Sequence, residues 1–427
     1  MSAYAVTKAR SKRLVAEPRM AEDEVFKTIA EMLGGDLHQK RLLSMTHGVL
    51  GVLQSASAAI STIGQGLALA RGLNPKHAVK QVDRLLSNGG INVWDLFSKW
   101  VPFVLADRKD IIVTLDWTDH AHDGQCTIAL NMVTSHGRAT PLMWKTVGKN
   151  ELKARRNGYE DDVLVSLRDI VPADVRITVL ADRGFGDQKL YAFAKEQNLD
   201  YVIRFRQDIL VTNVQGEARS ASEWVAPNGH ARRLGSATVT IDHAPVPVVV
   251  CVKHAGMKDA WGPTTPSYPS PLSVLGEGSP PGSEVTGIGW GGLASSRADL
   301  TGAAIVKLYG KRFTTEENFR DTKDIKFGLG LSATHIGTPE RRDRLLLLCA
   351  VSQALLTLLG AACERTGLDK RLKVNTAKKR THSLFRQGLY WYAAIPNMPD
   401  DWLRPLMDAF TCILQEHAIL CAIYGVI

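Results

Sequence analysis

Apolar residues recur at three- and four-residue spacings from Asp36 to Val104, which is the period of amphipathic helices. Turn-forming residues interrupt the stretch twice, at Gly72–Pro75 and at Asn88–Asn92. The pattern therefore predicts a helical N-terminal domain over residues 1–105.

One helix of this domain is expected to carry a line of cations. Asn74 followed by Pro75 is a favourable helix start, because asparagine caps free backbone amides and proline fits the first helical position. Lys76, Lys80 and Arg84 follow at intervals of four residues and share one face. A solvated charged face is the commoner explanation of such spacing, and a DNA-contacting helix is the alternative.

Beyond Asp110 the pattern becomes that of β-strands. The turn-like segments HAHDG and SHGRA separate three short runs rich in β-branched residues, which are IIVTLDW, CTIALNMVT and ATPLMWKTV. A helix is expected over Asp161–Ile170, a strand in RITVLADRGFGD, a helix over Lys189–Gln197 and a fifth strand in YVIRFR. Three antiparallel strands followed by alternating helices and strands is the order of an RNase H-like α/β core.

The chain changes character again after the fifth expected strand. Short β segments, notably SATVTID and VPVVVCV, precede a stretch rich in proline, glycine and serine, which predicts a surface loop or a disordered insertion. Helical periodicity returns at Leu300. The predicted fold class is α/β, with an RNase H-like catalytic core interrupted by a β-rich insertion and flanked by helical N- and C-terminal regions. The predicted boundaries are 106–207 and 300–336 for the core, 208–299 for the insertion with its loop at 262–292, and 337–427 for the C-terminal region.

The run from Leu345 to Cys363 is nearly long enough to cross a bilayer. It contains polar residues and stands alone, so we interpret it as a buried core helix and expect no membrane association. The N-terminus is polar and basic, with nothing that suggests secretion.

Composition adds two points. The formal net charge of +9 in 427 residues is compatible with a polyanionic partner such as nucleic acid, although many basic proteins bind none. The six cysteines form no CxxC pair and no histidine cluster accompanies them, which argues against a zinc site. Scattered cysteines in apolar surroundings are typical of reduced core residues in a cytosolic protein.

Two aspartates close apolar strands, Asp116 at the end of the first expected strand and Asp182 at the end of the fourth. A single aspartate at such a position is usually a turn residue. In the expected core these two strands are neighbours, so the two carboxylates would lie together. Two acids at that distance repel each other unless they share a proton or a metal ion.

The segment YGKRFTTEENFRDTK contains Tyr309, Arg312, Glu316 and Lys323 in the pattern Y-x2-R-x3-E-x6-K. On one continuous helix these four side chains would lie within an arc of about 60°. A salt-bridged surface helix explains the charges, because Arg312 and Glu316 form an i,i+4 pair. It explains neither the tyrosine nor the lysine two turns further on.

These segments resemble a known family. LDWTD around Asp116, ADRGFGD around Asp182 and YGKRFTTEENFRDTK around Glu316 are similar, in this order, to the three acidic motifs of the DDE transposases encoded by bacterial insertion sequences, of the insertion-sequence-four type. The third segment contains the YREK motif of that family. The resemblance implies a cut-and-paste DNA transposase that cleaves transposon ends and joins 3′-hydroxyls to target DNA.

The resemblance also implies roles for individual residues. Asp116, Asp182 and Glu316 would be catalytic and would hold two Mg²⁺ or Mn²⁺ ions, and oxygen-only carboxylate ligands suit such hard cations. Two ions can activate the nucleophile on one side of a phosphodiester and stabilise the leaving oxygen on the other. The expected DNA-binding residues are Tyr309, Arg312 and Lys323 of the motif, with Arg204 and Arg206, which alternate along the fifth expected strand.

The implied partners are double-stranded DNA, as terminal inverted repeats and as target, and a second copy of the chain in a homodimer on DNA. The implied location is the bacterial cytoplasm, in association with the nucleoid. The basic stretch between Lys370 and Arg386 is expected to contact phosphates.

The chain departs from the family pattern before the third motif. Relatives have a tryptophan in a strand there, and either Trp261 or Trp290 could be that residue, with LASSRAD as the expected continuation. An insertion at 262–292 could damage this strand. Two alternatives therefore stay open, a catalytically inactive or domesticated DNA-binding copy and a structure-selective RNase H-like nuclease.

Overall fold

The computed structural model describes residues 22–34, 37–153, 155–186, 188–240, 244–254, 289–378, 380–416 and 423. The chain divides into two compact units. One, here called the helical unit, combines the N-terminal residues up to 107 with residues 318–425. The other, the sheet unit, consists mainly of residues 108–317, and the division falls within helix α9 (Phe313–Lys323).

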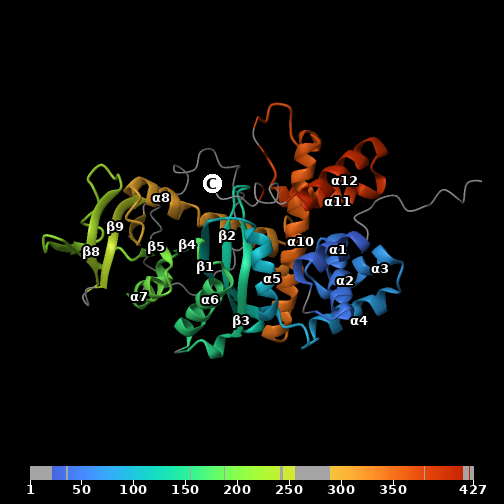
Figure 1. Cartoon of the computed structure of the whole chain (residues 1–427), viewed down its shortest axis with the longest axis horizontal. Helices are drawn as coiled ribbons and strands as arrows, with labels where there is room; N and C mark the ends of the chain where they lie inside the picture. The colour runs from blue at the N-terminus through green and yellow to red at the C-terminus, as the bar shows by residue number, and fades with distance from the viewer. Residues whose placement is uncertain are drawn as a thin grey trace, which may run out of the picture. The chain divides into compact units, whose positions relative to one another are not determined.

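The helical unit is assembled from both ends of the sequence. Its central element is α10, a helix of 27 residues, against which α2, α4, α5, α11 and α12 pack (Figure 1). The elements are α1 (Glu22–Leu33), α2 (Gln39–Ser55), α3 (Ile60–Arg71), α4 (Pro75–Leu86), α5 (Val93–Leu105), η5 (Leu331–Ala333), α10 (Pro339–Arg365), η6 (Leu368–Leu372), α11 (Leu384–Ala394), η7 (Ile395–Asn397) and α12 (Asp400–Gln415).

Helix α10 contains the apolar run that sequence analysis assigned to a buried core. By length and composition it could cross a membrane, but 89% of its most apolar window is buried inside the protein. A helix that is apolar on all sides is expected in the centre of a large helical core. The packing of α2, α4 and α5 against it, with α1 and α3 packed on those helices, agrees with the helical periodicity predicted for the N-terminal residues.

Two glycines bring α10 and α11 into backbone contact. A Cβ atom on Gly360 would lie 1.9 Å from the carbonyl oxygen of Leu384, and one on Gly388 would lie 1.8 Å from that of Leu356. Both distances are far below any real contact, so this packing requires glycine at both positions.

The sheet unit is built on ten strands in the order β3-β2-β1-β4-β5-β10-β9-β8-β6-β7. The strands are β1 (Asp110–His120), β2 (Gln125–Val133), β3 (Ala139–Gly148), β4 (Arg176–Ala181), β5 (Asp200–Phe205), β6 (Leu210–Asn213), β7 (Ala218–Ser220), β8 (Arg232–Val239), β9 (Ala244–His254) and β10 (Gly289–Ser295). The other elements are η1 (Ala121–Asp123), η2 (Lys149–Glu151), α6 (Arg156–Ile170), η3 (Arg183–Phe185), α7 (Gln188–Glu196) and α8 (Gly302–Gly310).

Strands β1, β4 and β5 are parallel to one another, whereas β2 and β3 run antiparallel to their neighbours. The first and fourth predicted strands are therefore adjacent, as expected. The strands after β5 do not form a sheet of their own, because β10 pairs with β5 and links β9, β8, β6 and β7 to the same sheet.

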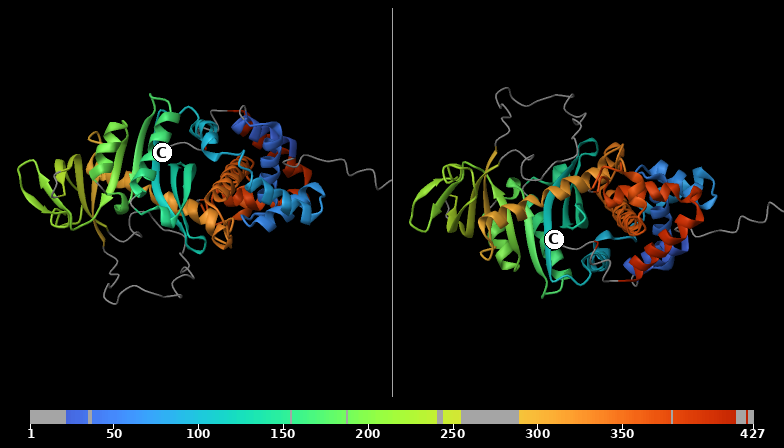
Figure 2. Two further views of the ribbon diagram at one scale, coloured as in Figure 1. Left: turned by 90° about the horizontal axis from the view of Figure 1, so that it is seen from below. Right: turned by 90° about the horizontal axis from the view of Figure 1, so that it is seen from above.

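Helices cover both faces of this mixed α/β sheet (Figure 2). Helix α8 lies on one face, where Ile305 and Leu308 join a core cluster with Ile112, Leu180 and Val202 of the strands. On the opposite face, α6 places Tyr159 against Cys126 and Val147. Successive side chains of a strand point to opposite faces of the sheet, so residues two apart contact the same helix layer.

Strand β10 begins at Gly289, inside the stretch that was expected to be a loop as far as Gly292. Trp290 is therefore in a strand that precedes the third motif, and the run Leu293–Ser295 continues that strand. Trp261 lies outside the described residues. The two-sided pairing of β10 with β5 and β9 explains its place in the sheet.

Candidate functional site

The register of β1 and β4 brings the two predicted aspartates together. The last parallel pair is Leu115 with Ala181, so Asp116 and Asp182 are the next residue on each strand. Sequence analysis placed Asp116 at a strand end, and this was wrong, because β1 continues to His120 in its antiparallel ladder with β2. Only the pairing with β4 stops before Asp116.

Alternation places both aspartates on the face that α8 covers. Thr114, two residues before Asp116, points to this face, where its hydroxyl forms a 2.5 Å hydrogen bond with that of Thr315 in α9. Both threonines are fully buried. This bond fixes the start of α9 over the middle of β1, close to the point where the pairing of β1 with β4 ends.

The segment around Glu316 is not one continuous helix, contrary to the geometry assumed from its sequence. Tyr309 is near the end of α8, Arg312 lies between the helices, and α9 begins at Phe313. The backbone amides of Lys311, Arg312, Thr314 and Thr315 each bond to the carbonyl three residues earlier, as in a tightened turn. Gly310, a poor helix former, precedes the break.

Arg312 nevertheless connects the acidic motifs. Its Nη1 lies 3.4 Å from Oδ2 of Asp116 and its Nη2 lies 3.1 Å from Oε1 of Glu316. Burial disfavours the charged guanidinium, but Tyr309 and the nearby carboxylates outweigh burial and raise the pKa of Arg312. The side chain, 18% exposed, is thus a fixed positive charge between two of the three predicted acids.

The charges of Asp182 and Glu316 both act on Asp116. Burial raises the pKa of Asp116; Arg312 lowers it, while the negative charges of Asp182 and Glu316 raise it further. Oδ1 of Asp116 accepts a hydrogen bond from the Trp117 amide, and Oδ1 of Asp182 accepts one of 2.7 Å from the Gly184 amide. The carboxylates are therefore oriented by the backbone of the segments that carry them.

The donor set fits a hard divalent cation in kind, since all three side chains offer carboxylate oxygens. The positions of these side chains are not those of a formed metal site, because no group of three His, Cys, Asp or Glu side chains among the described residues is close enough to hold an ion. Arg312 supplies positive charge between the carboxylates instead. A metal ion would have to replace this guanidinium as their counter-charge.

Tyr309 and Arg204 extend the site along the same face. Burial raises the pKa of Tyr309, and the positive charges of Arg312 and Arg204 oppose this. Arg204 in β5 is two residues beyond Val202, which faces α8, so alternation places it on this face. Its Nε is buried and has no hydrogen-bond partner among the described residues.

The other two predicted DNA-binding residues lie at or just beyond the ends of their elements. Arg206 lies beyond the last residue of β5, so its expected alternation with Arg204 along one strand was wrong. Lys323 ends α9, and its Nζ lies 5.0 Å from the ring of Phe319.

A contact network that was not predicted from the sequence lies behind the two aspartates. Trp117 donates a 2.8 Å hydrogen bond from Nε1 to Glu160 of α6, which also accepts one of 3.1 Å from Arg156. The Arg156 guanidinium lies 5.5 Å from the Trp117 ring and 5.9 Å from the ring of Phe185. Arg156 therefore links the segment after Asp116 to η3, which follows Asp182. The sequence LDW could have indicated this network, because alternation along a strand places Trp117 on the opposite face of the sheet from Asp116.

The segment HAHDG after Asp116 forms the turn that its sequence predicted, and it joins the antiparallel strands β1 and β2. Residues Ala121–Asp123 form η1, and Gly124 adopts a left-handed conformation with φ of 59° before β2 begins. His120 forms a 3.1 Å hydrogen bond with Thr127, and Asp119 forms an ion pair with Lys149.

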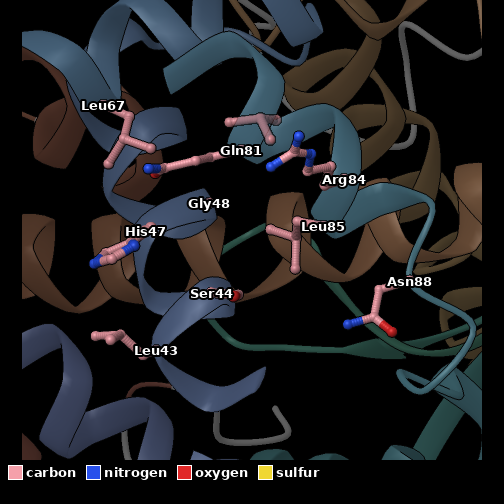
Figure 3. A pocket seen from close by; sticks show the side chains of 10 residues that line it. Leu43, Ser44, His47, Gly48, Leu67, Gln81, Arg84, Leu85 and Asn88 are labelled. Carbon is pink, nitrogen blue, oxygen red and sulfur yellow. The ribbon is translucent and has the colours of Figure 1, made fainter. Parts of the chain in front are cut away.

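A pocket of about 300 Å³ lies in the helical unit. Figure 3 shows His47 of α2, Leu67 of α3, and Gln81 and Arg84 of α4 around it. None of the predicted catalytic residues lines this pocket. Helix α4 buries Ala78, Val82, Leu85 and Leu86 and exposes Lys76, Lys80 and Arg84, as the predicted cationic face requires.

The sheet unit is thus a mixed α/β structure with an acidic site on one face of its sheet. Residues 150–353 match the family model of the transposase DDE domain, and this range includes Asp182 and Glu316 but begins after Asp116. The match supports a DDE-type transposase, which is a metal-dependent enzyme acting on DNA. Among curated proteins, none matches this chain.

Proposed function

We propose that the chain is a cut-and-paste DNA transposase of the insertion-sequence-four type, with an RNase H-like core and the YREK motif Tyr309, Arg312, Glu316 and Lys323. The observation that carries this proposal is the register of β1 and β4, which places Asp116 beside Asp182 where Arg312 and Glu316 approach. The transposase DDE domain match supports the same function.

Asp116, Asp182 and Glu316 would hold Mg²⁺ or Mn²⁺. Two such ions, when bound, activate water or a 3′-hydroxyl as nucleophile and stabilise the leaving oxygen of the phosphodiester. The same three side chains would serve cleavage at the transposon end and joining to target DNA, since only the nucleophile differs between these steps. The expected partners are terminal inverted repeats, target DNA and a second copy of the chain.

The remaining side chains of the site would bind DNA. The Arg312 guanidinium would donate to a phosphate next to the scissile bond, a geometry that guanidinium groups suit. Tyr309 and Arg204 lie on the same side of the sheet and would contact the neighbouring backbone. Lys323 and Arg206 would bind phosphates further along the DNA.

The test is strand cleavage of a labelled duplex that carries the element's own end, followed with and without Mg²⁺ or Mn²⁺. We expect the wild type to cut at the end only with metal, and Glu316→Gln to lose at least about 100-fold in rate, as is usual when a group that stabilises the transition state is removed. Glu317→Gln is the matched control, because Glu317 is adjacent on α9 but pairs with Arg138.

Equal cutting by the wild type and Glu316→Gln would overturn the assignment of the third acid. Binding of the DNA end without cutting by any variant would favour an inactive or domesticated copy. Cutting of branched DNA without any preference for the element's end would favour a structure-selective nuclease.

A further inference from the structure

Phe327 is presented to solvent by a hydrogen-bonded turn that follows α9. Its side chain is 43% exposed, and that of its neighbour Ile325 is 73% exposed. Oδ1 of Asp324 accepts hydrogen bonds from the amides of Lys326 and Phe327, at 2.8 Å and 2.7 Å, which hold the turn. The turn thus holds two neighbouring apolar side chains, Ile325 and Phe327, at the protein surface.

Three cations from three segments surround this ring. The guanidinium of Arg320 in α9 lies 5.9 Å from the ring centroid, the ammonium of Lys326 lies 5.2 Å from it, and the guanidinium of Arg386 in α11 lies 5.8 Å from it. Among the residues that the structure describes, none of the three forms an ion pair with a carboxylate.

Other cations of the basic stretch from Lys370 to Arg386 have partners within the helical unit, unlike those around Phe327. Arg371 stacks on Trp402 at 3.8 Å, Lys373 pairs with Asp369 at 3.2 Å, and Arg380 pairs with Glu364 at 2.6 Å. These cations stabilise the helical unit itself. Arg386, in contrast, is directed to the ring of Phe327.

We propose that Phe327 with Arg320, Lys326 and Arg386, here called the Phe327 surface, binds an unpaired nucleotide of a DNA strand. The base would stack on the ring and the cations would hold the adjoining phosphates. Aromatic rings interleaved with cations are the usual surface for single strands, because every base has a stacking face. In a fully paired duplex those faces are covered by neighbouring bases, so a duplex would bind this surface only through phosphate contacts with the cations.

This inference rests on the proposed function, since opening of the DNA near a cut is where a transposase would meet an unpaired base. It adds a binding site to the helical unit, separate from the carboxylates that would perform the cleavage.

The test measures binding of the full-length protein, without divalent metal, to a labelled thymidine strand of about 12 nucleotides and to a duplex of equal length. Phe327→Ala should weaken binding to the strand by about tenfold and change binding to the duplex less than about twofold, because stacking is lost and the cations remain. Phe327→Leu keeps apolar volume and should weaken strand binding equally, whereas Phe327→Trp should preserve it.

Tyr390→Ala is the matched control, because Tyr390 is an exposed aromatic residue of α11 at 56% exposure. Thermal melting checks that each variant is folded. If the wild type binds both DNAs and Phe327→Ala behaves like Tyr390→Ala, the Phe327 surface is not a base-binding site, while the proposed function stands. If the wild type binds neither DNA, both the proposed function and the role of the Phe327 surface are contradicted.

Discussion

Arg312 is the residue on which the metal-free site depends. Its guanidinium contacts Asp116 and Glu316 and is itself 18% exposed, so water screens these charges only in part. Without it, neighbouring carboxylates would face one another unpaired on a covered face of the sheet. The arginine therefore stabilises the fold and competes with any cation for the same oxygens.

We expect Arg312→Gln to lower the stability of the metal-free protein by about 1–2 kcal/mol, because it leaves partly buried carboxylates without a counter-charge. The melting temperature should fall by about 2–8 °C. Added Mg²⁺ should then raise the melting temperature of the variant more than that of the wild type, since no guanidinium has to be displaced. Differential scanning fluorimetry across a Mg²⁺ series measures both effects.

The control for this substitution is Arg138→Gln. Arg138 pairs with Glu317 at 3.2 Å, and both side chains are 24% exposed, which is similar to the Arg312 pair. Its loss should not alter the response to Mg²⁺. An equal Mg²⁺ response in all three proteins would contradict the competition described for Arg312.

At the scale of elements, alternation and β-branched runs were sufficient to predict β1 to β5, because half-buried strands leave a strong two-residue pattern. The strand order of the expected core, rather than alternation, predicted the adjacency of Asp116 and Asp182, which the register of β1 and β4 confirms. The break at Arg312 could not be predicted from periodicity, because Tyr309, Arg312 and Glu316 keep helical spacing across it. The tightened turn there is held by three-residue hydrogen bonds and by the Thr114–Thr315 contact, which is a tertiary interaction.

The junction of α10 with the basic stretch after it predicts a pH effect. Burial would raise the pKa of Glu364, but hydrogen bonds from Arg380 and Gln387 outweigh it and lower that pKa below its ordinary value of 4.5. A lowered carboxyl pKa stabilises the folded state above the ordinary value, and this contribution is lost as pH falls through the folded value.

Glu364→Gln should therefore cost about 1 kcal/mol at neutral pH, after allowing for partial solvent screening of the pair. The difference from the wild type should shrink as the pH is lowered below 4.5. Urea unfolding at a series of pH values measures this, with Asp408→Asn on the exposed side of α12 as control. If the difference in unfolding free energy stays constant with pH, the charge of Glu364 does not contribute to stability, and the effect of the substitution has another cause.

The backbone contact between α10 and α11 gives a second prediction for elements. Gly388→Ala should destabilise the protein by about 3 kcal/mol or more, because its methyl group would overlap the Leu356 carbonyl. Gly337→Ala is the control, since nothing lies within 4 Å of a Cβ at that position. Thermal unfolding followed by circular dichroism compares the two. Equal melting temperatures would mean that α10 and α11 can separate without loss.

At the scale of the whole molecule, the helical unit is discontinuous in sequence, and no local pattern revealed this. From the sequence, the N-terminal and C-terminal helices were predicted as two separate regions. Those domain boundaries stay a prediction. The packing of α2, α4 and α5 on α10 depends on contacts across more than half of the chain. Such long-range pairing is invisible to periodicity, which reports only which face of a helix is buried.

A chain that ends at Glu317 should therefore keep the sequence of α1 to α5 but lose their folded state. Isolated helices of 12 to 17 residues, the lengths of α2, α3 and α4, are marginal in water. Hydrogen exchange with mass spectrometry should show α2 peptides losing protection, with β1 and β4 peptides as internal reference. Protected α2 amides in the shortened chain would show that the N-terminal helices fold by themselves.

Translation meets the split helical unit in a fixed order. Helix α5 ends at Leu105 and α10 begins at Pro339, so roughly 230 residues are made between them, which takes roughly ten to fifty seconds at common ribosome speeds. During that interval the apolar faces of the first helices have no central helix to cover them. The acidic face of the sheet unit is complete before the helical unit is, and a nascent chain therefore carries Asp116, Asp182 and Glu316 earlier than its finished helical core.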